Sequence, residues 1–259
     1  MKALAELGKG VLRGAKFYIQ AAPLAYPKLV ECNVCGWQGK HLVSDGWHER
    51  SQCPSCRSGV RHRLLIAAWT HREDLSLAHL VRGKRVLHFA PERLIERKLR
   101  ECAGQYVTAD YLNPRRDLQL DLSDMGGIED GQFDLLIACD VLEHVADDRQ
   151  AIREIHRVLA PGGSAILTVP QQDHLKQTFE DPSIVTPEGR QHHFGQSDHL
   201  RIYGDDFPQL LLSAGFEVTA IDEHSFPPDL ATRHVLSPPE KSPHPLATNF
   251  RKVFFGRKS

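Results

Sequence analysis

The chain has 259 residues, which is enough for one α/β domain of ordinary size and a small additional module. Its 32 Lys and Arg residues nearly balance its 33 Asp and Glu residues, so no overall charge argues for nucleic acid or a membrane surface as the partner. No apolar run reaches the roughly 18 residues of a membrane-spanning helix, and charged residues interrupt the N-terminal stretch, so we expect a cytoplasmic protein.

Residues 1–28 are predicted to form an amphipathic helix followed by a linker that contains Pro23 and Pro27. Its basic residues would also suit a membrane surface. The favoured interpretation is a helix that packs against the body of the protein or against a partner subunit, which would make the protein a homo-oligomer.

Two C-x-x-C turns follow, and seventeen residues separate Cys35 from the second turn. Each turn presents two thiolates, and two such turns can close a tetrahedron around Zn²⁺, which predicts a zinc-ribbon-like module over residues 29–60. A redox pair and paired disulfides are the alternatives, but no thioredoxin-like strand precedes either turn. Four cysteine ligands leave no open position, so the zinc would be structural. The predicted ligands are Cys32, Cys35, Cys53 and Cys56.

A basic cluster opens the next segment, residues 61–83, which is predicted to be a connecting helix. The cluster comprises Arg57, Arg61, His62 and Arg63. It could contact phosphates of RNA or of a nucleotide-linked sugar. A polar seam between the module and the main domain is the favoured interpretation.

Residues 84–259 are predicted to form an α/β domain that starts with a strand at Val86–Phe89. Ala90-Pro91-Glu92 follows it, and a second strand at Gln105–Ala109 is closed by Asp110, eighteen residues beyond Glu92. An acidic side chain at that place can accept hydrogen bonds from both ribose hydroxyls of a nucleoside. The alternative is an aspartate that only caps a turn.

A short third strand at residues 118–120 precedes Asp121. The fourth strand, Phe133–Cys139, is nearly all apolar, as in a strand buried on both faces, and Asp140 stands where it ends. A helix capped by Asp147 or Asp148 comes next. Pro161-Gly162-Gly163 is predicted to stop that helix before a fifth strand at residues 164–169.

The FDLLIACDVLEHV and RVLAPGG segments, together with LLSAGFEV further on, resemble the recurrent motifs of class I S-adenosylmethionine-dependent methyltransferases. The resemblance covers about residues 84–221. It implies a doubly wound, seven-stranded α/β sheet and S-adenosylmethionine as the cofactor. The chain departs from the family at the first strand, where resembling enzymes usually have an acidic residue in place of His88 and a glycine-rich loop in place of Ala90-Pro91-Glu92.

On this resemblance, Glu92 would hold the methionine ammonium, Asp110 the ribose, and Asp140 would face the methionine moiety. Tyr111 would flank the adenine, and Asp121 would meet the adenine amino group, or else cap the segment that follows. The full predicted cofactor set is His88, Ala90, Pro91, Glu92, Asp110, Tyr111, Asp121, Leu122, Asp140 and Val141.

His144 follows Asp140 at the expected mouth of the site and is the candidate general base, because its unperturbed pKa lies near neutrality. The alternative is a histidine that only hydrogen-bonds the loop. Residues 171–204 are polar and follow the fifth strand, where the resembled family often has a segment that closes over the acceptor, so the resemblance implies a lid here. A second metal site among its histidines, which include His192, His193 and His199, is the less favoured interpretation. The last strand, at Val253–Phe255, is predicted to be an antiparallel edge strand.

Together these features predict a methyltransferase that acts on a hydroxyl of a small molecule or saccharide, or on RNA. A nicotinamide-dependent dehydrogenase is disfavoured, because no G-x-G-x-x-G follows the first strand. The remaining alternative is a non-catalytic protein that binds RNA or another protein through its zinc ribbon, on a degenerate methyltransferase fold.

Overall fold

The computed structural model describes residues 29–259, and the helix predicted at residues 1–28 lies outside the described residues. In chain order the elements are β1 (Val30–Glu31), β2 (Gln38–Gly39), α2 (Val60–His71), the 3₁₀ helix η1 (Glu73–Leu75), α3 (Leu77–Leu80), β3 (Arg85–Phe89), α4 (Arg93–Arg100), β4 (Gln105–Asp110), β5 (Leu118–Gln119), β6 (Phe133–Cys139), η2 (Leu142–His144), α5 (Asp148–Val158), β7 (Leu159–Thr168), β8 (Phe179–Glu180), α6 (Pro187–Phe194), β9 (Arg201–Ile202), α7 (Phe207–Ser213), β10 (Phe216–Ile221), η3 (Glu223–Ser225), α8 (Pro228–His234) and β11 (Val253–Lys258).

A seven-stranded sheet forms the centre of the molecule, with the strand order β10-β11-β7-β6-β3-β4-β5. Strands β3 to β7 run parallel to one another, and β11 is antiparallel to both β7 and β10. The order turns back between β3 and β6, which is where ligands bind in open α/β sheets. The predicted doubly wound seven-stranded sheet is therefore confirmed.

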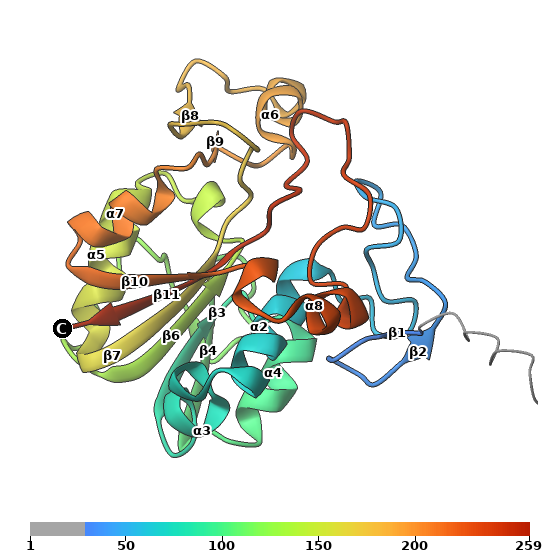
Figure 1. Ribbon diagram of the computed structural model, residues 1–259. Coiled ribbons are helices and arrows are strands. Elements are labelled where there is room, and N and C mark those ends of the chain that lie inside the picture. The colour runs from blue at the N-terminus through green and yellow to red at the C-terminus, as the bar shows by residue number, and fades with distance from the viewer. Residues whose placement is uncertain (1–28) are drawn as a thin grey trace, which may run out of the picture.

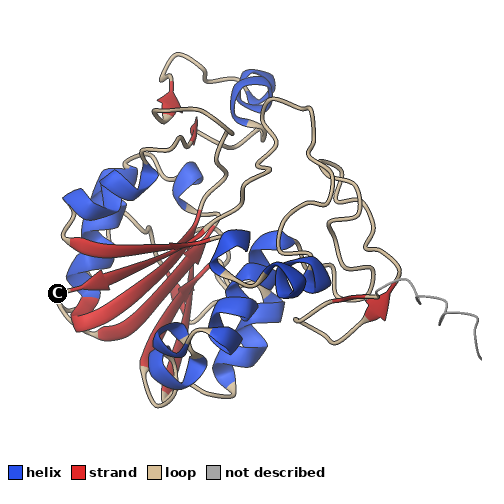
Figure 2. Cartoon of the chain, in the orientation of Figure 1, coloured by secondary structure: helices blue, strands red, loops and turns tan. Residues whose placement is uncertain are grey.

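Helices cover both faces of the sheet, as Figures 1 and 2 show. Strand β6 alternates between the two layers, because Leu135 and Ile137 pack in the core beneath α2 and α4, whereas Leu136 and Ala138 pack in the core beneath α5 and α7. The apolar run that predicted a fully buried strand thus serves two cores at once.

The last strand corrects one prediction. Strand β11 is antiparallel, as expected, but it lies between β7 and β10 rather than at the edge. Val253, Phe254 and Phe255 are all buried, so consecutive residues face opposite apolar layers. That pattern is typical of an interior strand, and β10 takes the edge instead.

Strand β7 begins earlier than the sequence predicted. It starts at Leu159, directly after α5, and the predicted stop at Pro161-Gly162-Gly163 is an irregularity within the strand. Gly162 has a φ of +75°, and a Cβ on Gly163 would lie 2.8 Å from the Ala160 carbonyl oxygen, so both positions favour glycine.

The N-terminal module is anchored to the main domain by one buried guanidinium. Arg63 on α2 is 0% exposed and donates hydrogen bonds to the carbonyl oxygens of Ser51 and Ser58 at 2.7 Å, and of His234 and Val235 at 2.9 Å. Apolar residues of the module share one hydrophobic core with α2 and the sheet. The hydrophobic core is continuous across residues 60 and 83, where we predicted the boundaries between the module, the connecting helix and the α/β domain. These domain boundaries therefore stay predictions.

The segment 171–204 lies beyond the carboxyl ends of the parallel strands and carries β8, β9 and α6 (Figure 1). Arg201 fixes it there by donating to the carbonyl oxygens of Leu142 and Ala146, in the connection after β6. Tyr203 donates to Asp148 at 2.8 Å. Among the helices of residues 29–259, none is long and apolar enough to cross a bilayer.

Candidate functional site

The four cysteines of the two C-x-x-C turns lie together. Cys32 Sγ is 3.7 Å from Cys56 Sγ, and Cys35 Sγ is 3.8 Å from Cys53 Sγ. Sulfurs bound to a tetrahedral Zn²⁺ at about 2.3 Å are roughly 3.8 Å apart, whereas a disulfide bond measures about 2.05 Å. The cluster therefore fits a metal ion and does not fit paired disulfides.

The carboxyl ends of four parallel strands bring most of the predicted cofactor residues to one edge of the sheet. Phe89 of β3 lies level with Ala109 of β4 and with Ala138 of β6. Ala90 and Asp140, the residues just beyond β3 and β6, both have positive φ angles, +44° and +52°. Strained backbone of this kind clusters at ligand sites.

The two aspartates further along this edge use one oxygen each for local turns. Asp110 Oδ1 accepts from the backbone N–H groups of Leu112 and Asn113, both at 2.9 Å, and Asp121 Oδ1 accepts from Ser123. Within residues 29–259 the second oxygen of each aspartate makes no hydrogen bond. Capping and ligand binding are therefore compatible at both positions. Tyr111 is 64% exposed beside Asp110.

An ionic network joins the module's helix to the same edge. Glu92 pairs with Arg61 and with His62, whose Nε2 lies 2.8 Å from Glu92 Oε1. Arg61 Nε is also 3.1 Å from Asp140 Oδ2, and Arg251 Nη1 is 3.4 Å from Asp140 Oδ1. The polar seam expected from the basic cluster thus reaches into the predicted cofactor site.

This network keeps both carboxylates ionised. Burial alone would raise the pKa of Asp140, but the neighbouring Arg61 and Arg251 and the Thr168 hydroxyl hold it well below its usual range. Burial likewise opposes ionisation of Glu92, and the hydrogen bond from His62 together with the charge of Arg61 lowers its pKa. Sequence reasoning placed Arg61 in the seam and missed its contact with these carboxylates.

His88 does not join this edge. It is 1% exposed within β3, and its Nδ1 lies 2.7 Å from the Tyr106 hydroxyl. The His88 side chain is therefore buried in the layer of α2 and α4 and is not exposed at the strand-end edge. Burial lowers the pKa of His88 to about 4.

His88 should make the fold sensitive to mild acid. Its folded-state pKa of about 4 lies below the unfolded value of 6.5, so the unfolded chain takes up the proton first. The contribution of His88 to the free energy of unfolding is fully present above pH 6.5. It is lost as the pH drops toward 4, by about 3 kcal/mol in total. His88→Asn, which keeps a polar atom near Tyr106, should flatten that part of the curve. Urea unfolding at several pH values measures it, and equal slopes for both proteins between pH 6.5 and 4 would contradict the prediction.

A second group of polar side chains lies where η2 meets the segment 171–204. It contains Glu143 and His144 from η2 and His199, and their ligand-type atoms all lie within 4.8 Å of one another. His144 Nδ1 is 3.4 Å from Asp198 Oδ2, and the His144 and His199 rings meet edge to face with centroids 4.7 Å apart. Burial, followed by the charge of Asp140, raises the pKa of Glu143.

The three histidines predicted as a possible second metal site lie in different surroundings. His192 and His193 are exposed on α6, whereas His199 is buried beside His144. The sequence could have indicated part of this group, because Glu143 and His144 follow a predicted strand end. Only the folded chain brings His199 next to them.

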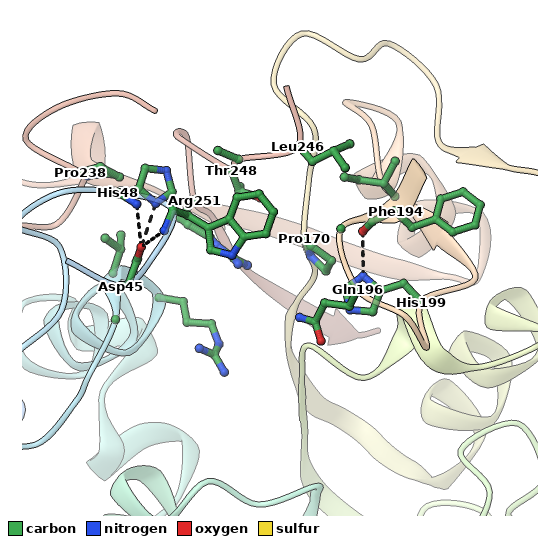
Figure 3. A pocket seen from close by; sticks show the side chains of 17 residues that line it. Asp45, His48, Pro170, Phe194, Gln196, His199, Pro238, Leu246, Thr248 and Arg251 are labelled. Carbon is green, nitrogen blue, oxygen red and sulfur yellow. Dashed lines mark hydrogen bonds and ion pairs between the residues drawn. The ribbon is translucent and has the colours of Figure 1, made fainter. Parts of the chain in front are cut away.

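A cleft of about 130 Å³ lies between the N-terminal module and the segment 171–204 (Figure 3). Trp47 and His48 come from the module, Gln196 and His199 from the opposite side. Arg61 and Arg251, which both contact Asp140, line it as well, together with other residues. The cleft therefore opens beside the strand-end edge, and the module contributes part of its wall.

Comparison with known proteins gives the same fold. Residues 86–167 match the family model described as a methyltransferase domain. The crystal structure of an S-adenosylmethionine-dependent methyltransferase from Mesorhizobium loti is 15% identical, with a TM-score of 0.50, over 77% of this chain and 100% of that one. At this identity the similarity speaks for the fold alone, and the fold is that of class I methyltransferases.

Two further proteins are similar over part of their length. The 1,6-didemethyltoxoflavin-N1-methyltransferase of Burkholderia thailandensis is 17% identical, with a TM-score of 0.46, over 77% of this chain and 88% of that one. An uncharacterized 37.1 kDa protein in transposon TN4556 of Streptomyces fradiae is 34% identical over 94 residues. That match spans 36% of this chain and about a quarter (27%) of the relative.

Proposed function

We propose that this class I methyltransferase fold binds S-adenosylmethionine at the strand-end edge and transfers its methyl group to an acceptor in the adjoining cleft. The observation that supports this most is the convergence of Glu92, Asp110, Asp121 and Asp140 at one edge of the sheet, within the segment that matches a methyltransferase domain. Four carboxylates at this edge suit a ligand that carries hydroxyl, amino and ammonium donors.

Each residue has a proposed part in holding the cofactor. Asp110 would accept from the ribose hydroxyls beside the exposed Tyr111, and Asp121 from the adenine amino group, with the Leu122 backbone next to the ring. The α-ammonium would lie near Glu92 and Asp140.

The loops after β3 and β6 would hold the methionine moiety. Ala90 and Pro91 form the first of these loops, and Val141 belongs to the second. Arg61 lies between Glu92 and Asp140 and would receive the α-carboxylate, because a guanidinium matches carboxylate geometry.

The cofactor's sulfonium makes its methyl group electrophilic, so the protein mainly has to align the acceptor and accept a proton. We propose His144 as the general base, with the Asp198 carboxylate orienting its ring. The segment 171–204 would act as the lid. The acceptor would be a hydroxyl of a small molecule or saccharide, or of RNA, and the cleft of about 130 Å³ would hold the group that receives the methyl. Zn²⁺ held by the four cysteines would be structural.

Calorimetric titration with S-adenosylmethionine and S-adenosylhomocysteine tests this proposal. We expect the native protein to bind both ligands. Asp110→Ala should weaken both by about 100-fold, because it removes charge-assisted hydrogen bonds to the ribose. Asp229→Ala is the matched control, since Asp229 is an exposed aspartate on α8, which contacts β1 of the N-terminal module. This variant should bind both ligands with native affinity. If the native protein bound neither ligand, the non-catalytic interpretation would replace the enzyme.

A further inference from the structure

We propose that Glu143, His144 and His199 form a second metal site, separate from the cysteine cluster, for a divalent transition metal such as Zn²⁺. The three side chains come from two segments, η2 and the turn after α6, that are far apart in sequence. Two imidazoles and one carboxylate are a common ligand set for such ions.

Two buried polar atoms in this cluster have no partner. Glu143 is 1% exposed and His199 is 2% exposed, yet Glu143 Oε2 and His199 Nε2 make no hydrogen bond within residues 29–259. Buried polar atoms are nearly always paired, so two orphaned atoms within one cluster call for an explanation. A bound cation would satisfy both of them.

The hydrogen bonds around the imidazoles favour this role. His199 Nδ1 lies 3.0 Å from the Phe194 carbonyl oxygen (Figure 3), and because a carbonyl only accepts, Nδ1 carries the proton. The lone pair of His199 is therefore on Nε2, the orphaned atom. The Asp198 carboxylate lies behind the other imidazole, with its Oδ2 3.4 Å from His144 Nδ1 in an ion-pair contact. Metal-binding histidines typically have such a partner behind the ring.

The geometry needs only a small adjustment. Three ligands at about 2.1 Å from a tetrahedral ion lie roughly 3.4 Å apart, and the ligand-type atoms here lie within 4.8 Å of one another. Since His199 belongs to the segment 171–204 and the other two ligands to η2, the ion would draw that segment onto the edge of the sheet.

The site has a consequence for the acceptor, and this step rests on the proposed function. Three protein ligands leave an open position, and His199 is the one of the three that lines the cleft. An acceptor hydroxyl that reached the ion past the His199 ring would bind it and become more acidic. The hydroxyl proton would pass to solvent, the oxygen would bond to the methyl carbon, and the carbon–sulfur bond would break with its electron pair left on sulfur. His144 would then be a ligand rather than the base.

Metal stoichiometry tests the site without any methyl transfer. Untagged protein is dialysed against Zn²⁺, or against Co²⁺ as a spectroscopic probe, and bound metal is measured. We expect Glu143→Gln and His199→Gln to bind one equivalent less than the native protein. His192→Gln, an exposed histidine on the same segment, should keep the native value. When Co²⁺ is used, the thiolate-to-metal absorption band should be the same in the native protein and in both variants, because the ion that the variants lose has no thiolate ligand. An unchanged band also reports that the cysteine cluster is intact.

Equal stoichiometry in the native protein and in the Glu143→Gln and His199→Gln variants would overturn the metal site and leave His144 as the base. Calorimetry with S-adenosylhomocysteine on the same samples separates the two proposals. Native binding of that ligand by Glu143→Gln together with loss of one metal equivalent supports both. If the native protein binds the second metal equivalent but does not bind S-adenosylhomocysteine, the proposed methyltransferase function is overturned and the metal site stands.

Discussion

Replacing Cys53 with Ser is expected to unfold the N-terminal module and to weaken cofactor binding as well. Cys53 is completely buried in the four-cysteine cluster. Zinc binding by small domains contributes about 10–16 kcal/mol of apparent folding free energy, which a hydroxyl ligand does not replace. Because the module shares its core with α2, its loss should lower the melting temperature by roughly 10 °C or more.

The effect on the cofactor follows from the position of α2. Arg61 and His62 stand on this helix and pair with Glu92, and Arg61 also contacts Asp140. A displaced helix would leave Glu92 without both of its partners and Asp140 without Arg61. It would also remove the proposed contact of the α-carboxylate, so we expect at least a roughly tenfold loss of S-adenosylhomocysteine affinity.

Cys102→Ser is the matched control for this experiment. Cys102 is a half-buried cysteine outside the metal cluster, so the variant should keep the native metal content, melting temperature within a few degrees, and ligand affinity. Metal analysis, thermal unfolding and calorimetry measure the three quantities. Native metal content and affinity in Cys53→Ser would show that the module neither needs the cysteines nor supports the cofactor site.

Arg63→Met is expected to destabilise the protein by about 3–5 kcal/mol. The Arg63 guanidinium is buried among the carbonyl oxygens of Ser51, Ser58, His234 and Val235 and forms no ion pair with a carboxylate in the described part of the chain. Methionine fills similar space but leaves these acceptors without donors, and a hydrogen bond from a charged group contributes about 1.5–3 kcal/mol. Burial lowers the pKa of Arg63 to about 10, so it remains charged at neutral pH.

Lysine should not rescue this position, because one ammonium cannot reproduce the planar fork that reaches four carbonyl oxygens. Arg57→Met is the control, since the Arg57 side chain is exposed and its loss should change the unfolding free energy by no more than about 0.5 kcal/mol. Urea unfolding curves give the comparison. If Arg63→Met and Arg57→Met unfolded at the same urea concentration, the buried guanidinium would not hold the module in place.

Local sequence patterns determined most of the elements. The apolar run Phe133–Cys139 predicted a strand buried on both faces, and β6 occupies those residues. Asp147 was expected to cap a helix, and its carboxylate accepts from the Gln150 N–H group at 2.8 Å. The same kind of pattern failed at the last strand, because an apolar strand shows that both faces are buried but does not say which strands lie beside it.

The candidate site was predictable to the extent that it follows strand ends. Asp110, Asp121 and Asp140 each come directly after a predicted strand, and parallel strands end at one edge, so their proximity follows from the fold. His88 lies inside a strand, and its sequence position gave no sign that Tyr106 would bind it there. The contacts of Arg61 and Arg251 with Asp140 join residues 79 and 111 positions apart, and no local pattern encodes them.

The sequence by itself determined the class of fold, the cysteine cluster and the strand-end carboxylates, because these depend on spacing within short segments and on the geometry of parallel strands. The tertiary structure alone decided how the parts meet. It placed α2 against Glu92, β11 inside the sheet, and His199 next to Glu143 and His144. Such contacts arise from packing between segments that are distant in the chain, where many sequence spacings satisfy the same apolar pattern and only the complete core selects one arrangement.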